Sequence, residues 1–80
     1  MKLLELTEFL VKNLVSDPET VSIKQFEDGE FIIIEVLVDE KDMGMLIGKA
    51  GNTANAIRTL VQASSYVHEN KKVRININSI

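Results

Sequence analysis

A pair of glycines flanking a lysine is the feature of this 80-residue sequence best suited to chemistry. Gly-Lys-Ala-Gly, residues 48–51, separates a short apolar pattern from a longer helical one. Glycine adopts positive φ at little cost, and a helix that begins after residue 51 presents backbone N–H groups and the positive end of its dipole. Lys49 adds a full positive charge. The pattern predicts a site for anions such as backbone phosphates, and a plain corner between two helices is the alternative.

Other groupings of reactive side chains favour structural roles. His68, the one histidine, lies in a polar stretch and is expected to be solvated, because catalysis needs an oriented partner and a pocket. Asp39, Glu40 and Asp42 could hold Mg²⁺, but their place before an apolar pattern favours helix capping. The sequence has no cysteine, and Gly-Lys-Ala-Gly is too short for a P-loop. We therefore expect no enzyme, no metal site and no cofactor.

Charge is distributed unevenly along the chain. Residues 1–48 carry four lysines against eleven acidic residues, a net charge of −7, whereas residues 49–80 carry five basic residues against one acidic residue, a net charge of +4. This asymmetry predicts a locally basic face on an acidic body, with chance as the alternative. The five basic residues are Lys49, Arg58, Lys71, Lys72 and Arg74.

The first half of the chain predicts one helix and a hairpin. Residues 3–15 have helical periodicity, and Asp17-Pro18 should end this helix. Its expected apolar side consists of Leu3, Leu6, Leu10 and Leu14, widened by Phe9. Strands are expected at 20–26 and 31–38, joined by an Asp-Gly turn within residues 27–30. In the second strand, Ile32, Ile34, Val36 and Val38 form one face, and Phe31, Ile33, Glu35 and Leu37 form the other.

The second half predicts two helices and a final strand. Asp39 should cap a short helix, helped by Asp42 in its first turn, with an apolar side of Met43, Leu46 and Ile47. A helix over 52–67 should bury Ala54, Ile57, Leu60, Val61 and Ser64. After a polar connection at 68–72, residues 73–78 alternate as a strand with Val73, Ile75 and Ile77 inward. The order α-β-β-α-α-β predicts an α+β fold of two layers, with the helices on one face of a three-stranded sheet.

Length and hydropathy predict a small soluble protein. Eighty residues suffice for one domain, expected over 1–80, with a single core. The N-terminal residues lack the long apolar run of a signal peptide, and no stretch reaches the ~18 apolar residues of a membrane span. We expect a cytoplasmic location and no membrane contact.

The sequence resembles a known family of RNA-binding domains. "LIGKAGNTA", residues 46–54, resembles the signature of KH domains, and the α-β-β-α-α-β order is similar to the type II KH arrangement. Residues 42–61, "DMGMLIGKAGNTANAIRTLV", are similar to KhpA-type proteins, small bacterial KH proteins that consist of little besides this domain. The resemblance covers almost the whole chain.

This resemblance implies that single-stranded RNA is the ligand. In KH domains the Gly-x-x-Gly loop clamps about four nucleotides, which assigns phosphates to Gly48, Lys49, Ala50 and Gly51. Bases would lie in an apolar groove of Ile47, Ala54, Ile57 and the closing strand at 73–75, although Ile57 fits the core better. Arg58, Lys71 and Lys72 would add phosphate contacts. Asn52 and Asn55 stand where KhpA-like chains often carry basic residues. The implied role is a low-specificity post-transcriptional regulator or RNA chaperone.

The alternative function is a protein-interaction module with little RNA affinity of its own. With helices on one side of the sheet only, Phe31, Ile33 and Leu37 would be exposed on the other side, which is typical of a contact surface. A homodimer, or assembly with a second, larger KH-domain protein of the kind that KhpA-type proteins are described as joining, would cover them. The two functions are compatible.

Overall fold

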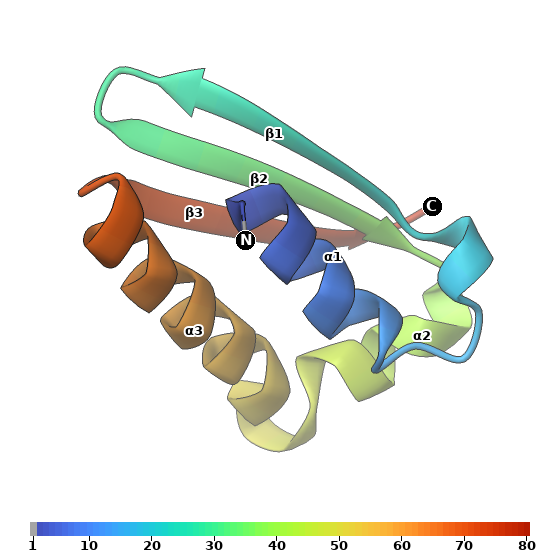
Figure 1. Ribbon diagram of the computed structural model, residues 1–80. Coiled ribbons are helices and arrows are strands. Elements are labelled where there is room, and N and C mark those ends of the chain that lie inside the picture. The colour runs from blue at the N-terminus through green and yellow to red at the C-terminus, as the bar shows by residue number, and fades with distance from the viewer. Residues whose placement is uncertain (1) are drawn as a thin grey trace.

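Three helices lie on one side of a three-stranded sheet in the computed structural model, which describes residues 2–80 (Figure 1). The elements are α1 (Leu3–Lys12), β1 (Ser22–Asp28), β2 (Phe31–Val38), α2 (Glu40–Ile47), α3 (Asn52–His68) and β3 (Lys72–Ser79). Short 3₁₀ turns, η1 and η2, occupy Pro18–Thr20 and Lys49–Gly51. The predicted α-β-β-α-α-β order and the two-layer α+β class are confirmed. Within residues 2–80, every helix is too short or too polar to cross a bilayer.

The sheet has β2 at its centre. β1 pairs with it antiparallel and β3 pairs with it parallel, so that Ile34 lies between Gln25 and Ile75. A parallel pair cannot be closed by a tight turn and needs a long crossover. The α2–α3 hairpin supplies that crossover and covers one face of the sheet on its way (Figure 1).

The core follows the alternation predicted for β2. Ile32, Ile34, Val36 and Val38 are completely buried, while the residues between them are half-buried or exposed. Buried side chains of all three helices pack on this face, namely Leu3, Val11, Leu46, Ile57 and Val61. Complete burial of one such side chain contributes about 1.5–3 kcal/mol. The second strand therefore contributes more buried side chains to the core than any other single element.

The first helix differs from the prediction in length and in its buried side. It ends at Lys12 rather than 15, where the Asn13 side chain and backbone both donate to the Phe9 carbonyl. Leu3, Thr7 and Val11 form the buried line, and the Thr7 hydroxyl is satisfied by the Leu3 carbonyl at 2.8 Å. The other three predicted leucines pack at the flanks of the core. Phe9 is 56% exposed, so its predicted part in the buried side is wrong.

Two further corrections concern α3 and the hairpin. The helix buries positions 54, 57, 61 and 65, so Leu60 is exposed, and Ser65 rather than Ser64 is fully buried. The Ser65 hydroxyl reaches the interior because it donates to the Lys71 carbonyl at 2.6 Å. In the hairpin, the first strand runs over 22–28 rather than the predicted 20–26. Asp28 pairs directly with Phe31, which leaves a two-residue turn with Gly29 at φ 63°.

The start of α2 is fixed by two carboxylates with different roles. Asp39 accepts a hydrogen bond from the Lys41 amide at 3.1 Å, as predicted for a cap. Asp42 is buried and turns toward the segment after α1, where it accepts bonds from the Ser16 hydroxyl at 2.6 Å and the Ser16 and Asp17 amides at 3.0 and 3.3 Å. These bonds, that of the Ser16 hydroxyl first, hold the pKa of Asp42 below its ordinary value of 3.8. Asp42 thus joins α2 to the end of the α1 segment.

The Asp42 contact predicts a pH-dependent stability. A lowered folded-state pKa means that the carboxylate stabilises the fold above its ordinary pKa of 3.8 and that this contribution is lost as the pH falls through the lowered value. We expect Asp42→Asn to lower the Tm by several degrees at neutral pH and by progressively less under strongly acidic conditions. Thermal unfolding followed by circular dichroism checks this, with exposed Glu40→Gln as the control. An equal loss of Tm at every pH would contradict the charge-based account.

Candidate nucleic-acid interface

The Gly-Lys-Ala-Gly loop, residues 48–51, forms the corner between α2 and α3. Gly48 ends α2 by donating its N–H to the Gly44 carbonyl at 2.9 Å, and it has φ 76° and ψ 175°. This region of backbone space is essentially closed to residues with a Cβ. Ala50 and Gly51 also have positive φ, at 55° and 76°. Three of the four loop residues are therefore in conformations that favour glycine.

The two glycines serve different purposes. A Cβ on Gly48 would collide with the Thr53 side chain and would lie 2.9 Å from the Thr53 backbone nitrogen, so Gly48 allows the start of α3 to pack against the end of α2. A Cβ on Gly51 would meet only the Asn55 side-chain nitrogen, at 3.8 Å. Gly51 is required for its backbone conformation and leaves the surface above it open.

The tip of the loop has two backbone donors that are free to bind a ligand. The Gly51 and Asn52 amides donate within the turn, to the Gly48 and Lys49 carbonyls. Within residues 2–80 the amides of Lys49 and Ala50 have no hydrogen-bond partner, and both residues are exposed. They lie at the N-terminus of a 17-residue helix, where the dipole favours an anion. Two amides and the Lys49 ammonium group can therefore meet one phosphate.

A groove runs between α3, the helix that follows this loop, and β3. It is lined by Arg58, Thr59, Gln62, Ala63, Tyr66 and Val73. The Arg58 guanidinium donates twice to the Ile75 carbonyl, both at 3.3 Å. Gln62 donates to the Lys71 carbonyl and accepts from the Val73 amide, both at 2.9 Å. These side chains tie the edge strand to the helix and set the width of the groove.

Gln62 is a site residue that the sequence did not reveal. It stands four residues after Arg58, so both side chains lie on one helix face, and this spacing is the only available signal. Its hydrogen bonds are made to the start of β3, and the position of that strand beside α3 cannot be deduced from the spacing of residues along the helix.

The exposures separate the predicted groove residues. Ile47 is 40% exposed beside the loop, and Val73 is half-buried and lines the groove. Ala54 and Ile57 are each only 3% exposed and belong to the core, as the sequence already favoured for Ile57, so little of either side chain is open to a base. Their spacing of three residues matches the buried line of α3, which sets them beneath the site. Ile75 is likewise buried, and its carbonyl, not its side chain, faces Arg58.

The predicted basic residues do not form one cluster. Lys49 lies at the start of α3, whereas Lys71 and Lys72 follow its end, about 25 Å away along a helix of 17 residues. Lys71 pairs with Glu27 at 3.5 Å. Arg58, between the two ends, is engaged by Ile75 and by Asn55, whose side-chain oxygen it meets at 3.4 Å. Lys71 and Lys72 line a second hollow together with Gly29, Glu30, Phe31, Tyr66, Glu69 and Asn70.

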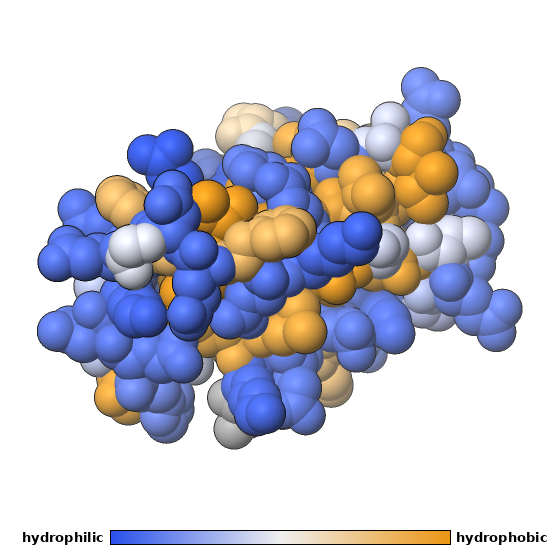
Figure 2. Space-filling model, turned by 90° about the horizontal axis from the view of Figure 1, so that it is seen from above, coloured by the Kyte–Doolittle hydropathy of each residue, from blue (hydrophilic) through white to orange (hydrophobic). Residues whose placement is uncertain are grey.

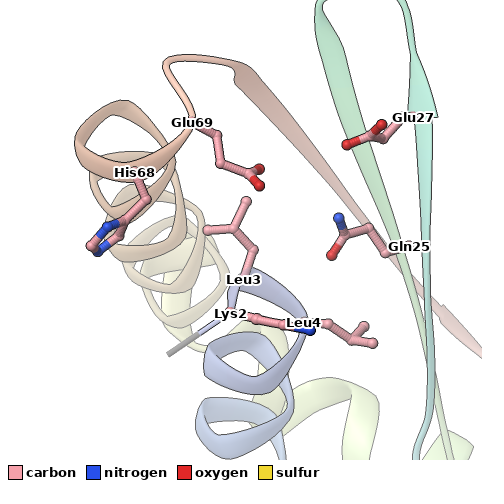
Figure 3. A pocket seen from close by; sticks show the side chains of 7 residues that line it. All are labelled: Lys2, Leu3, Leu4, Gln25, Glu27, His68 and Glu69. Carbon is pink, nitrogen blue, oxygen red and sulfur yellow. The ribbon is translucent and has the colours of Figure 1, made fainter.

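A third hollow lies between the start of α1, the inner side of β1 and the end of α3. It is lined by Lys2, Leu3, Leu4, Gln25, Glu27, His68 and Glu69. Figure 3 shows Gln25, Glu27 and Glu69 directed into the space, while His68 turns away from it. Two carboxylates make it a poor site for phosphate. Residues 2–80 contain no group of three metal-ligating side chains here or elsewhere.

Comparison with known proteins gives a consistent family. The family model described as "KhpA/KhpB, KH domain" matches residues 5–77. The chain is 47% identical over 73 residues to the RNA-binding protein KhpA of Clostridium perfringens (strain 13 / Type A), covering 91% of this chain and 96% of that protein. It is 42% identical over 73 residues to the RNA-binding protein KhpA of Chlamydia trachomatis, covering 91% and 92% of the two chains.

Solved structures support the fold. The crystal structure of Era in complex with MgGDPNP and nucleotides of 16S ribosomal RNA is similar with a TM-score of 0.68 at 18% identity, over 96% of this chain and 29% of the Era chain. With the observed element order, this likeness confirms the predicted type II KH-like fold.

The three glycines around the loop predict a graded response to alanine. Gly51→Ala should cost about 1–2 kcal/mol because a residue with a Cβ must hold a left-handed conformation. Gly48→Ala should cost more because it adds the collision with Thr53. Gly44→Ala, in the exposed and open middle of α2, should stabilise the fold by about 0.5–1 kcal/mol. Urea denaturation measures the three values, and any other ranking of the glycines would contradict the assigned roles.

Proposed function

We infer that this chain, which belongs to the KhpA/KhpB KH-domain family, binds single-stranded RNA as one KH domain spanning residues 1–80. The observation that carries this proposal is the pair of unpartnered amides at Lys49 and Ala50, within residues 2–80, next to the Lys49 ammonium group and the α3 N-terminus. One phosphate meets these groups, and Gly48 and Gly51 allow the backbone to approach it closely. The relatives named as RNA-binding proteins support the same ligand.

The groove between α3 and β3 is the proposed path for the bases next to the clamp. Tyr66 and Val73 provide apolar contacts there, and Arg58 provides charge. Ile47 borders the entrance beside the loop. Asn52 and Asn55 are exposed on the first turns of α3 and supply neutral amides near the phosphates, so this end of the site relies on Lys49 for its full charge.

Weak charge and few base-reading groups favour binding of low specificity. The chain has a net charge of −3, and only Lys49 and Arg58 accompany the loop and groove. Sequence is read by hydrogen bonds to base edges, and two of the four polar side chains of the groove, Arg58 and Gln62, are already bonded to the β3 segment. We propose a cytoplasmic post-transcriptional regulator or RNA chaperone that needs no metal, cofactor or catalytic step.

A second candidate function, assembly with another protein chain, is favoured by the outer side of α3. Leu60 is 53% and Val67 77% exposed, and Arg58 is the one charged residue between positions 52 and 67. A second copy of this chain or a larger KH-domain protein would cover this surface. On the outer face of the sheet, the patch predicted from Phe31, Ile33 and Leu37 is less exposed than expected, since Ile33 and Leu37 are half-buried and Phe31 is 36% exposed.

Two anions on the clamp should abolish RNA binding. The double variant Lys49→Asp/Ala50→Asp places carboxylates where the phosphate is expected, and the exposed loop tip tolerates polar residues. We expect binding to a mixed-sequence single-stranded RNA to fall below detection in a gel shift while the circular dichroism spectrum is unchanged.

The matched control makes the same change of charge elsewhere. Phe9→Asp/Lys12→Asp alters two exposed positions of α1, outside the loop and the groove. It should retain most of the binding. Equal binding by the folded clamp variant and the wild type would refute the clamp.

Salt should weaken the complex in proportion to the phosphates neutralised. Dissociation constants of about 10⁻⁶ M or weaker are expected at physiological salt. For single strands, log K falls with log salt at about −0.7 per phosphate contact, so Lys49→Gln should make the slope shallower by about that amount. Fluorescence anisotropy at several salt concentrations measures it. A tight, salt-insensitive complex with one short sequence would contradict this account, and salt-insensitive association with a protein would instead favour the second candidate.

A further inference from the structure

The aromatic side chains of this protein all lie on its surface. The sequence holds three phenylalanines and one tyrosine, and Phe9, Phe26, Phe31 and Tyr66 are 36–56% exposed. Aromatic side chains are the largest apolar groups available to a core, and a domain of this size needs its apolar residues for burial. Their exposure leaves all four rings available for contact with a ligand.

Two of these rings share the outer face of the sheet, the face without helices. Phe26 pairs with Ile33, and Phe31 precedes Ile33 by two residues, so the two rings are diagonal neighbours within reach of each other. Phe31 also pairs with Lys72, and the Arg74 guanidinium lies 5.3 Å from the centre of the Phe31 ring. The outer face thus combines two exposed rings with two cations of the edge strand β3.

These rings are continuous with the groove. Tyr66 lines both the groove between α3 and β3 and the second hollow, whose other lining residues include Phe31, Lys71 and Lys72. A strand that leaves the groove at Tyr66 therefore passes the two lysines and reaches Phe31 at the edge of the outer face. This path accounts for basic residues that lie some 25 Å from the clamp.

We propose that the outer face of the sheet is a second, base-stacking surface for the same single-stranded RNA, with bases on Phe26 and Phe31 after passage over Tyr66. The inference rests on the proposed RNA-binding function and extends it. Successive bases stack on exposed aromatic rings in many single-strand binders, with little dependence on sequence. Phosphates pass Lys72 and Arg74.

Charge favours RNA over a second copy of the chain as the occupant. The outer face carries Lys24, Lys72 and Arg74 against Asp28 and Glu35, in a protein that is acidic as a whole. A two-fold dimer through this face would bring together two faces that are each net positive. Seen from above Figure 1, where β1 lies, hydrophilic groups cover most of the surface, and the apolar groups that adjoin one another lie toward one end (Figure 2). Glu30 and Glu69 also line the hollow, so stacking rather than charge holds the RNA there.

The test compares oligouridylates of increasing length. Fluorescence anisotropy is measured with 4- and 12-nucleotide RNAs for the wild type and for Phe26→Leu/Phe31→Leu, which keeps apolar bulk but removes both rings. The clamp accommodates about four nucleotides, so the 4-mer should bind both proteins equally. The 12-mer should bind the variant about tenfold more weakly than the wild type, with an unchanged salt slope, because stacking is lost. Phe9→Leu, on α1, is the control and should bind as the wild type.

Each other outcome overturns the proposal. Equal 12-mer binding by the wild type and the folded double variant removes the stacking surface but leaves the clamp intact. Equal weakening for both lengths means that the rings act on the clamp itself. If the wild type binds neither RNA, the proposed function fails as well. If Phe26→Glu/Phe31→Glu dissociates a wild-type dimer in sedimentation while RNA binding is unchanged, the face is a protein interface.

Discussion

The parallel pairing of β2 with β3 is the constraint on which the rest of this structure depends. Parallel strands cannot be joined by a hairpin turn, so the chain between them must cross back along the sheet. Here α2 and α3 make that crossing and meet at four residues, 48–51. The sharp corner places the N-terminus of α3 at one end of the molecule. The same pairing makes β3 an edge strand beside α3, which creates the groove. The Gly-Lys-Ala-Gly loop and the groove are both consequences of one crossover connection.

The strained corner persists because its neighbours hold it. Positive φ at Gly48, Ala50 and Gly51 disfavours the loop, and Ala50 is the one of these residues that has a Cβ. Packing of Gly48 on Thr53 fixes the approach of the two helices, and the Asp42 carboxylate binds α2 to residues 16 and 17. The loop is therefore fixed by tertiary contacts on both sides, so the proposed binding of an anion requires little rearrangement.

The sequence predicted the features that depend on local pattern. Alternating apolar residues predicted the buried face of β2, Asp39 predicted the cap of α2, and the two glycines predicted the corner between α2 and α3. Each of these features depends on residues that are close together in the chain. It could not give contacts set by the tertiary arrangement. Ser65 is buried only because it meets the Lys71 carbonyl, and Leu60 was expected on the buried side because helical spacing alone does not fix how wide a stripe of the helix meets the sheet. Phe26 was overlooked since its strand alternates weakly.

The separation of the basic residues changes what kind of binding site this fold can form. In a compact basic patch, affinity comes from phosphates alone and rises with every lysine. Here the cations stand at two ends of α3 and on the edge strand, with acidic residues between them, such as Glu30 and Glu69 in the second hollow. Coulomb attraction between such dispersed charges and RNA is largely screened beyond about 8 Å at physiological salt. Exposed aromatic rings act at contact and are unaffected by that screening, so the proposed stacking surface supplies what the dispersed cations of an acidic protein lack for holding a longer strand.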